Sequence, residues 1–231
     1  RFPFALTASQ DQVVKDLIAD LSTDVPTNRL IQGDVGAGKT VVALYAMLMA
    51  VASEQQAAIM APTEILAEQH FASISAMLAG SQVRVELLTG ATPAGERASI
   101  LDRCKAGEID ILVGTHALLT ETVRFGSLAV AIIDEQHHFG VHQRAQLRSK
   151  GAATGDAADG REVTPHVLVM TATPIPRTLA ITLFGDLDIS VIAGLPPGRQ
   201  PIATRVVSHD KRGEVYGWLR TRLDRGEQAY I

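Results

Sequence analysis

The stretch Gly33-Asp34-Val35-Gly36-Ala37-Gly38-Lys39-Thr40 decides the fold of this chain. It fits the pattern G-x-x-x-x-G-K-[ST], whose glycines let the backbone wrap closely around a phosphate group. The short segment 29–32 before it predicts a strand, and the helical spacing of apolar residues over 40–52 predicts a helix after it. A simple glycine-rich turn is the alternative, but a strand before and a helix after are the context that a phosphate-binding loop requires.

The residues of this loop have separate expected roles. Successive backbone N–H groups would point at the phosphates, and the following helix would add its positive N-terminal end. Lys39 would reach the β- and γ-phosphates, and the hydroxyl of Thr40 would bind Mg²⁺. We therefore expect a nucleotide to be held by the whole loop, namely by Gly33, Asp34, Val35, Gly36, Ala37, Gly38, Lys39 and Thr40.

The segments around the loop alternate between strand-like and helix-like patterns. The run 128–133 is almost purely apolar, as expected for a central strand of a parallel sheet covered on both faces. The alternation predicts an α/β fold, with a doubly wound and mostly parallel sheet between helices. Strands are predicted at 57–60, 83–88, 109–113, 128–133 and 167–170, and helices at 64–78 and 94–106.

The pattern changes towards the end of the chain. Residues 150–164 are rich in Gly, Asp and Ala and predict a mobile surface loop. The stretch Gly194-Leu195-Pro196-Pro197-Gly198 predicts a linker, so we expect a first domain over 1–193, a linker over 194–200 and an incomplete second domain over 201–231. In that second part we expect strands at 202–207 and 228–231 and a helix at 211–223. The missing initiator Met suggests a piece of a longer protein.

Composition limits the function classes. The 231 residues are 46% hydrophobic, enough for one full core, and the net charge of -4 argues against a surface coated in basic residues. Any nucleic acid would therefore meet a local patch, or another domain would supply much of the positive charge. The single cysteine, Cys104, excludes an internal disulfide framework, suits a cytoplasmic protein and is expected in the core rather than as a catalytic thiol. The longest uncharged apolar run, 41–52, is too short to span a membrane.

An acidic motif, Asp134-Glu135-Gln136-His137, follows the apolar strand. A carboxylate at the end of a buried strand near a phosphate loop can hold Mg²⁺ through water, and we assign this role to Asp134. Glu135 would orient and polarise the attacking water. Taken alone, such a pair could equally begin a solvated loop.

Near the N-terminus, Thr7 and Gln10 can be interpreted in two ways. The spacing is that of a capping box, with Thr7 at the N-cap and Gln10 at the third helical position. The Gln10 amide can also donate and accept at once, as recognition of an adenine edge requires. Both roles can hold together.

Three polar corners follow predicted strands, at Pro62-Thr63-Glu64, Gly114-Thr115-His116 and Thr171-Ala172-Thr173-Pro174. Each threonine could simply cap a helix. Each could also contact a phosphodiester, because the carboxyl edge of an open α/β sheet is where ligands bind. His137 would link the acidic motif to Thr171 and Thr173 by hydrogen bonds.

In this order the motifs resemble the first motor lobe of superfamily-two helicases, a RecA-like P-loop NTPase lobe. Within that superfamily the chain resembles the RecG family most, on residues 60–70, 134–137, 171–180 and 185–192. The transcription-repair coupling factor shares residues 174–177 and is the nearest alternative, but Gln136-His137 and residues 63–66 favour RecG. His138 departs from the family, which usually carries Arg there.

The resemblance implies ATP and Mg²⁺ as cofactors and ATP-driven translocation on branched DNA, such as stalled forks and Holliday junctions, in recombination and repair. It also implies a monomer with an N-terminal wedge domain and a second motor lobe that supplies an arginine finger. By the resemblance, Gln10 would bind adenine; DNA would be contacted by Thr63, Gly90, Thr115 and His116; and coupling would use His137, Thr171, Thr173 and Arg177.

Without the resemblance, the residues indicate only a Mg²⁺-dependent P-loop NTPase whose sheet edge is suited to nucleic acid. A non-translocating nucleotide switch and a small-molecule kinase are the other classes. A switch does not need the corner threonines. A kinase lid over 150–164 would be expected to carry several arginines, and it has only Arg161.

Overall fold

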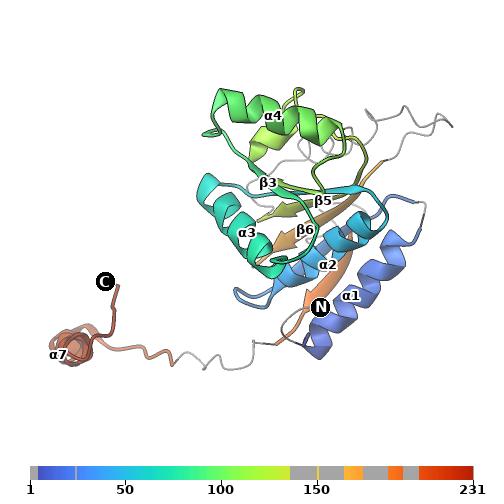
Figure 1. The fold of residues 1–231 in the computed structure, drawn as a ribbon. Coiled ribbons are helices and arrows are strands. Elements are labelled where there is room, and N and C mark those ends of the chain that lie inside the picture. Colours follow the sequence, from blue (N-terminus) through green and yellow to red (C-terminus); the bar gives the residue numbers. More distant parts are fainter. Residues whose placement is uncertain are drawn as a thin grey trace. The chain divides into compact units, whose positions relative to one another are not determined.

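A central parallel sheet organises the first part of the chain. The computed structural model describes residues 5–23, 25–135, 150, 164–173, 187–194 and 203–230. Within them seven strands pair in the order β3-β4-β2-β5-β6-β1-β7, and every pairing is parallel (Figure 1). The strands are β1 (Asn28–Gly33), β2 (Gln56–Met60), β3 (Val85–Leu88), β4 (Ile111–Gly114), β5 (Leu128–Asp134), β6 (His166–Thr171) and β7 (Asp188–Ile192).

One helix precedes the first strand, and the others connect successive strands. They are α1 (Ala8–Leu21), α2 (Lys39–Ala52), α3 (Glu64–Met77), α4 (Ala94–Lys105) and the short 3-10 helix η1 (His116–Leu119). Each strand and helix predicted between residues 29 and 170 is present, with bounds that differ by at most two residues. Strand β7 was not predicted, because its five residues mix exposed and buried positions.

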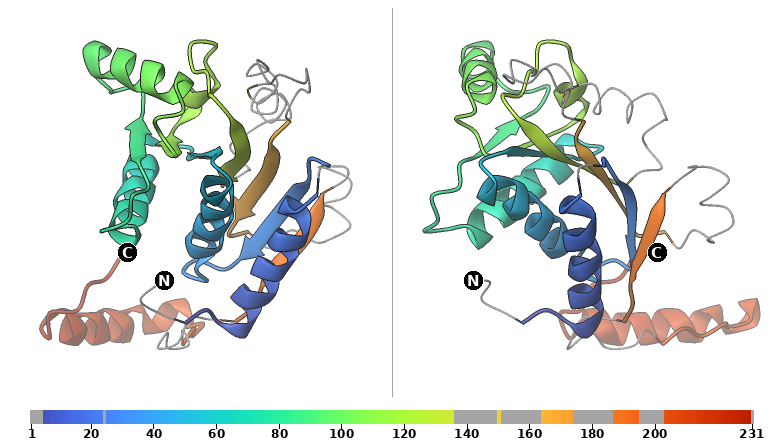
Figure 2. Two further views of the ribbon diagram at one scale, coloured as in Figure 1. Left: turned by 45° about the vertical axis from the view of Figure 1, so that its right-hand side comes forward. Right: turned by 90° about the vertical axis from the view of Figure 1, so that its right-hand side faces the viewer.

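Two apolar cores form because alternate side chains of a strand point to opposite faces. In β5, Val130 and Ile132 face the core closed by α1, α2 and α3. Their neighbours Ala131 and Ile133 belong to a second core, which also contains residues of α4, η1 and the segment around Phe125. Figure 2 shows α1, α2 and α3 together on one side of the sheet. The sheet is therefore covered on both faces, which confirms the predicted α/β class.

The chain divides into two compact units, Arg1–Pro196 and Pro197–Ile231. In the second unit the 3-10 helix η3 (His209–Lys211) leads into α7 (Arg212–Leu223), where a helix was predicted. The strands predicted at 202–207 and 228–231 were wrong for their described residues, 203–207 and 228–230. A strand needs a ladder partner, and no strand occurs among residues 203–230. That this unit begins a second motor lobe stays a prediction.

The mobile surface loop predicted at 150–164 lies mostly outside the described residues. Lys150, at its start, is buried, and its ammonium donates to the carbonyl oxygens of Thr120 and Val123. Of the predicted linker, Gly194 is described, with a φ of 90°. Among the described residues, no helix is long and apolar enough to cross a membrane.

Candidate functional site

The loop between β1 and α2 has the backbone geometry of a phosphate cradle. Gly36 and Gly38 take φ values of 80° and 82°, a left-handed conformation that side chains disfavour. A Cβ built on Gly38 would lie 2.3 Å from Nε2 of Gln10, so a larger residue would displace the Gln10 amide as well as strain the backbone. Gly38 also precedes the first turn of α2, whose N–H groups have no intrahelical acceptors.

Lys39 lies inside this turn. Its Nζ donates to the carbonyl oxygens of Gly33 at 2.7 Å and Asp34 at 3.2 Å. An ammonium has three donors, so one remains for a phosphate oxygen while two hold the side chain over the loop. Together, the cradle of N–H groups and the cation fit a polyphosphate.

The structure confirms the capping box of α1. The Thr7 hydroxyl accepts from the Gln10 N–H at 3.2 Å, and Oε1 of Gln10 accepts from the Thr7 N–H at 2.9 Å. Nε2 of Gln10 donates to the carbonyl of Ala37 at 2.8 Å, inside the phosphate loop. Each amide atom has capacity for a second bond, so the cap leaves the predicted adenine contact possible.

Helix α1 is also fastened to β7 beside Gln10. The hydroxyl of Ser9 accepts from the Ala193 N–H at 2.6 Å and donates to the Val191 carbonyl at 3.5 Å. This attachment fixes the first turn of α1 near the phosphate loop. Sequence reasoning missed Ser9, because its partners lie more than 180 residues away.

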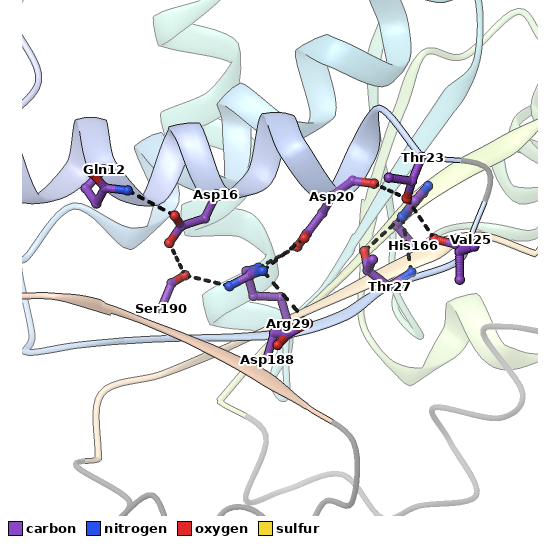
Figure 3. Close-up of polar contacts among 10 residues, drawn as sticks. All are labelled: Gln12, Asp16, Asp20, Thr23, Val25, Thr27, Arg29, His166, Asp188 and Ser190. Carbon is purple, nitrogen blue, oxygen red and sulfur yellow. Dashed lines mark hydrogen bonds and ion pairs between the residues drawn. The ribbon is translucent and has the colours of Figure 1, made fainter.

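A polar network anchors the other half of α1 (Figure 3). Arg29 on β1 binds both carboxylate oxygens of Asp20, at 2.5 and 2.9 Å, and donates to Ser190 at 2.9 Å. The Ser190 hydroxyl donates in turn to Asp16 at 2.7 Å. The bonds to Asp20 raise the pKa of Arg29 above its ordinary value, although burial opposes this. Helix α1 is thus held at two places, which sets Gln10 relative to the loop.

The acidic motif begins at the carboxyl end of β5. Asp134 is buried, with 8% of its surface exposed, and its Oδ1 accepts from the Glu135 N–H at 3.1 Å. Glu135 has a φ of 51°, which is uncommon for a residue other than glycine. Such strained conformations cluster at functional sites. The turn at Glu135 therefore agrees with the predicted role of the pair.

A second bond to Asp134 was not predicted. Nε2 of His70 on α3 lies 2.7 Å from Oδ2 of Asp134, and both side chains are buried. The sequence signal was slight: His70 shares a helical face with the buried residues Ala67 and Ile74. Nothing local identifies its partner 64 residues away.

The third predicted polar corner, at Thr171 and Thr173, lies between the acidic motif and the phosphate loop. Thr171 ends β6, opposite Gln32 of β1, and Met170 pairs with Asp134 of β5. The hydroxyls of Thr171 and Thr173 are 2.8 Å apart, and the Thr173 N–H donates to Thr171 at 3.1 Å. We call the carboxyl ends of β5, β6 and β1 the nucleotide half of the sheet.

Two of the three predicted polar corners follow β2 and β4. Together with the loop after β3, we call them the corner half. Thr63 caps α3 by accepting from the Leu66 N–H at 3.3 Å, and its side chain is exposed. Beside it, Oε1 of Glu64 accepts from the Ala91 N–H at 3.0 Å and so holds the loop after β3. Gly90 lies in that loop, and a Cβ on it would come within 3.0 Å of Oε1 of Glu64. Thr63 and Gly90 thus belong to one surface.

Thr115 requires a correction. Its side chain is 1% exposed, and its hydroxyl accepts from the Ala117 N–H at 3.5 Å. A hydroxyl buried under its own corner cannot meet a phosphodiester, so the predicted contact of this side chain is wrong. His116, the next residue, is exposed. The corner itself is tight, because a Cβ on Gly114 would lie 2.2 Å from the Leu88 carbonyl oxygen.

Several predicted residues lie outside the described part, namely Gln136, His137, His138 and Arg177. Cys104 is buried at 0% exposure, and burial raises the pKa of its thiol to about 12. A thiolate is the reactive form of cysteine, so Cys104 is a core residue, as predicted.

The chain is similar to known proteins in sequence and in fold. The family of DEAD/DEAH box helicases matches residues 7–181. Proteins named ATP-dependent DNA helicase RecG are 50% identical in Synechocystis sp. and 48% identical in Streptococcus pneumoniae, over 99% of this chain in each case. A solved structure of RecG bound to a three-way DNA junction is 40% identical over 99% of the chain, with a TM-score of 0.82.

These matches confirm the predicted resemblance to RecG. The chain spans only 26% of the Synechocystis protein, 32% of the Streptococcus protein and 29% of the chain in the solved structure. The family match nevertheless extends from the capping box of α1 past the end of β6. The chain belongs to the DEAD/DEAH box helicase family.

Proposed function

We propose that this chain is the ATP-binding motor lobe of a DNA translocase that acts on branched DNA. The observation that carries the proposal is the strand order β3-β4-β2-β5-β6-β1. It gathers the two nucleotide motifs and the Thr171 corner on three neighbouring strands, and the other two polar corners and the Gly90 loop on the next three. Since all strands are parallel, both sets lie on the same edge of the sheet. Similarity to RecG bound to a three-way junction supports branched DNA as the partner.

In the nucleotide half, backbone N–H groups and Lys39 would hold the phosphates, and Gln10 would contact the base. Thr40, at the start of α2, and Asp134, at the end of β5, would hold Mg²⁺. Oxygen donors of this kind suit that cation, and Mg²⁺ would neutralise phosphate charge. Glu135 would orient the attacking water and accept its proton.

In the corner half, DNA phosphates would meet Thr63, the loop at Gly90 and the exposed His116. Backbone N–H groups and hydroxyls contact phosphates without reading sequence, as expected of a motor that moves along DNA. Thr171 and Thr173 lie between the two strands that carry the nucleotide motifs and would couple hydrolysis to movement. The assignments of His137 and Arg177 also remain part of this proposal.

The test uses a full-length protein that carries this chain. ATP turnover is measured without DNA, with linear duplex and with a three-way junction, and Lys39→Ala serves as the inactive control. We expect turnover to be stimulated most by the junction. Equal stimulation by linear duplex would favour a motor like the transcription-repair coupling factor, and no stimulation by any DNA would favour a nucleotide switch.

A further inference from the structure

A buried contact joins the two halves of the sheet edge. His70 and Asp134 are 9% and 8% exposed, and Nε2 of His70 lies 2.7 Å from Oδ2 of Asp134. His70 belongs to α3, which follows β2 in the corner half. Asp134 ends β5 in the nucleotide half, and β2 pairs directly with β5. The contact therefore crosses the boundary between the halves.

With the hydrogen bond from His70, both oxygens of the Asp134 carboxylate are hydrogen-bonded. An ionised carboxylate only accepts hydrogen bonds, so Nε2 of His70 is the donor. The other oxygen, Oδ1, accepts from the Glu135 N–H at 3.1 Å. One bond on each oxygen stops the carboxylate from rotating, and each oxygen keeps capacity for a Mg²⁺-bound water. Bonds of this kind, from residues behind a metal ligand, orient the ligand.

Packing alone does not explain a histidine at this position. The buried face of α3 consists of Ala67, His70 and Ile74, and the two neighbours are fully buried apolar residues. A buried polar ring lowers stability unless it is hydrogen-bonded, whereas an apolar side chain would fill the same space without that penalty. The bond to Asp134 is the feature that an apolar residue could not provide.

Helix α3 begins at Thr63, and His70 lies about two turns further along it. A displacement of the helix at the Thr63 corner would therefore move the donor that holds Asp134. We propose that His70 is a positioning residue that fixes Asp134 for Mg²⁺ and links the corner half to the nucleotide half. The link to DNA rests on the proposed role of the corner half, and the effect on Mg²⁺ rests on the proposed role of Asp134 as a Mg²⁺ ligand.

The test compares three variants in the full-length protein. His70→Leu keeps an apolar side chain but removes the donor, and His70→Gln keeps an N–H donor of similar reach. Ile74→Ala is the matched control, because it opens a cavity about one turn further along the same buried face of α3 and removes no hydrogen-bond donor. Binding of a fluorescent, non-hydrolysable ATP analogue is titrated with Mg²⁺ in the absence of DNA. DNA stimulation of ATP turnover is measured separately.

We expect His70→Leu to raise the Mg²⁺ concentration for half-maximal binding about tenfold. Binding in EDTA should stay unchanged, and DNA stimulation should fall. His70→Gln should restore both properties, and Ile74→Ala should lower only the melting temperature. If His70→Leu does not fold, His70→Met, whose flexible side chain adapts to gaps, replaces it.

Wild-type Mg²⁺ dependence in the folded apolar variant would overturn the proposal. An equal loss in His70→Gln would also overturn it, because the hydrogen bond would then not matter. Failure of the proposed function looks different: the wild-type protein itself would show no DNA stimulation, while the Mg²⁺ titration without DNA would still test His70.

Discussion

The nucleotide half and the corner half hold their polar residues in different ways. In the nucleotide half, Gln10 bonds to Ala37, 27 residues away, and Asp134 bonds to His70, 64 residues away, although Thr171 and Thr173 bond locally to each other. In the corner half, Thr63 and Thr115 bond to backbone groups within three residues. Glu64, which reaches Ala91, is the long-range exception there.

This difference shows that a capping pattern in the sequence does not by itself indicate a functional residue. A local cap forms whether or not a ligand binds, so Thr63 and Thr115 look alike in sequence although one is exposed and the other buried. A hydrogen bond between residues far apart in the sequence forms only when the tertiary fold brings the two residues together. The nucleotide half is therefore a preorganised site, and the corner half is a surface whose role depends on exposure.

The prediction with the largest expected effect tests whether the nucleotide half and the corner half are sufficient for rapid ATP hydrolysis. Both lie in this chain, but the resemblance places an arginine finger in a second lobe. We expect the chain alone to bind Mg²⁺-ATP yet to hydrolyse it roughly 10³–10⁵-fold more slowly than a full-length protein. Steady-state phosphate release with branched DNA present measures this. Comparable rates would show that one lobe holds a complete active site.

Glu135→Gln tests the chemistry of the nucleotide half. An amide polarises water poorly, so turnover should fall roughly 10²–10⁴-fold while ATP affinity is unchanged. Glu54→Gln is a matched control, because Glu54 also has a positive φ, of 57°, but lies in the turn after α2. Near wild-type turnover in Glu135→Gln would remove Glu135 from the catalytic role.

Lys39→Ala tests the phosphate cradle. It removes the cation that lies 2.7 Å from the Gly33 carbonyl oxygen. Loss of a charge-assisted bond should weaken ATP binding roughly tenfold to a hundredfold. Nucleotide titration of the purified chain measures it. Lys15→Ala serves as the control, since Lys15 is exposed and pairs only with Asp11 among the salt bridges of the described residues. Unchanged affinity in Lys39→Ala would contradict the assignment of the loop.

The prediction with the smallest expected effect distinguishes the role of Thr63 from that of Thr115. Both Thr63→Ala and Thr115→Ala remove a cap and should cost about 1 kcal/mol of stability. Only Thr63→Ala should also lower DNA-stimulated turnover more than basal turnover, because only Thr63 is exposed. Thermal melts and turnover with and without junction DNA measure both effects. An equal loss of basal and stimulated turnover in Thr63→Ala would make this residue a cap alone.

Much of the fold follows from local pattern. The apolar run 128–133 predicted the central strand, and its fully buried residues confirm it. The glycines of the phosphate loop predicted its turn, since only glycine adopts the φ values of Gly36 and Gly38 without strain. The strands predicted at 202–207 and 228–231 failed because a strand depends on a partner that local pattern does not supply.

By itself the sequence determined the element types, the phosphate loop, the acidic motif and the capping box of α1, because each depends on neighbouring residues and on backbone stereochemistry. Only the tertiary structure decided which strands are neighbours, and hence that His70 meets Asp134, that Arg29 holds Asp20 and that Thr115 is buried. The physical reason is the parallel sheet. Parallel strands need long crossover connections, so residues far apart in sequence meet at one edge in an order that no local pattern contains.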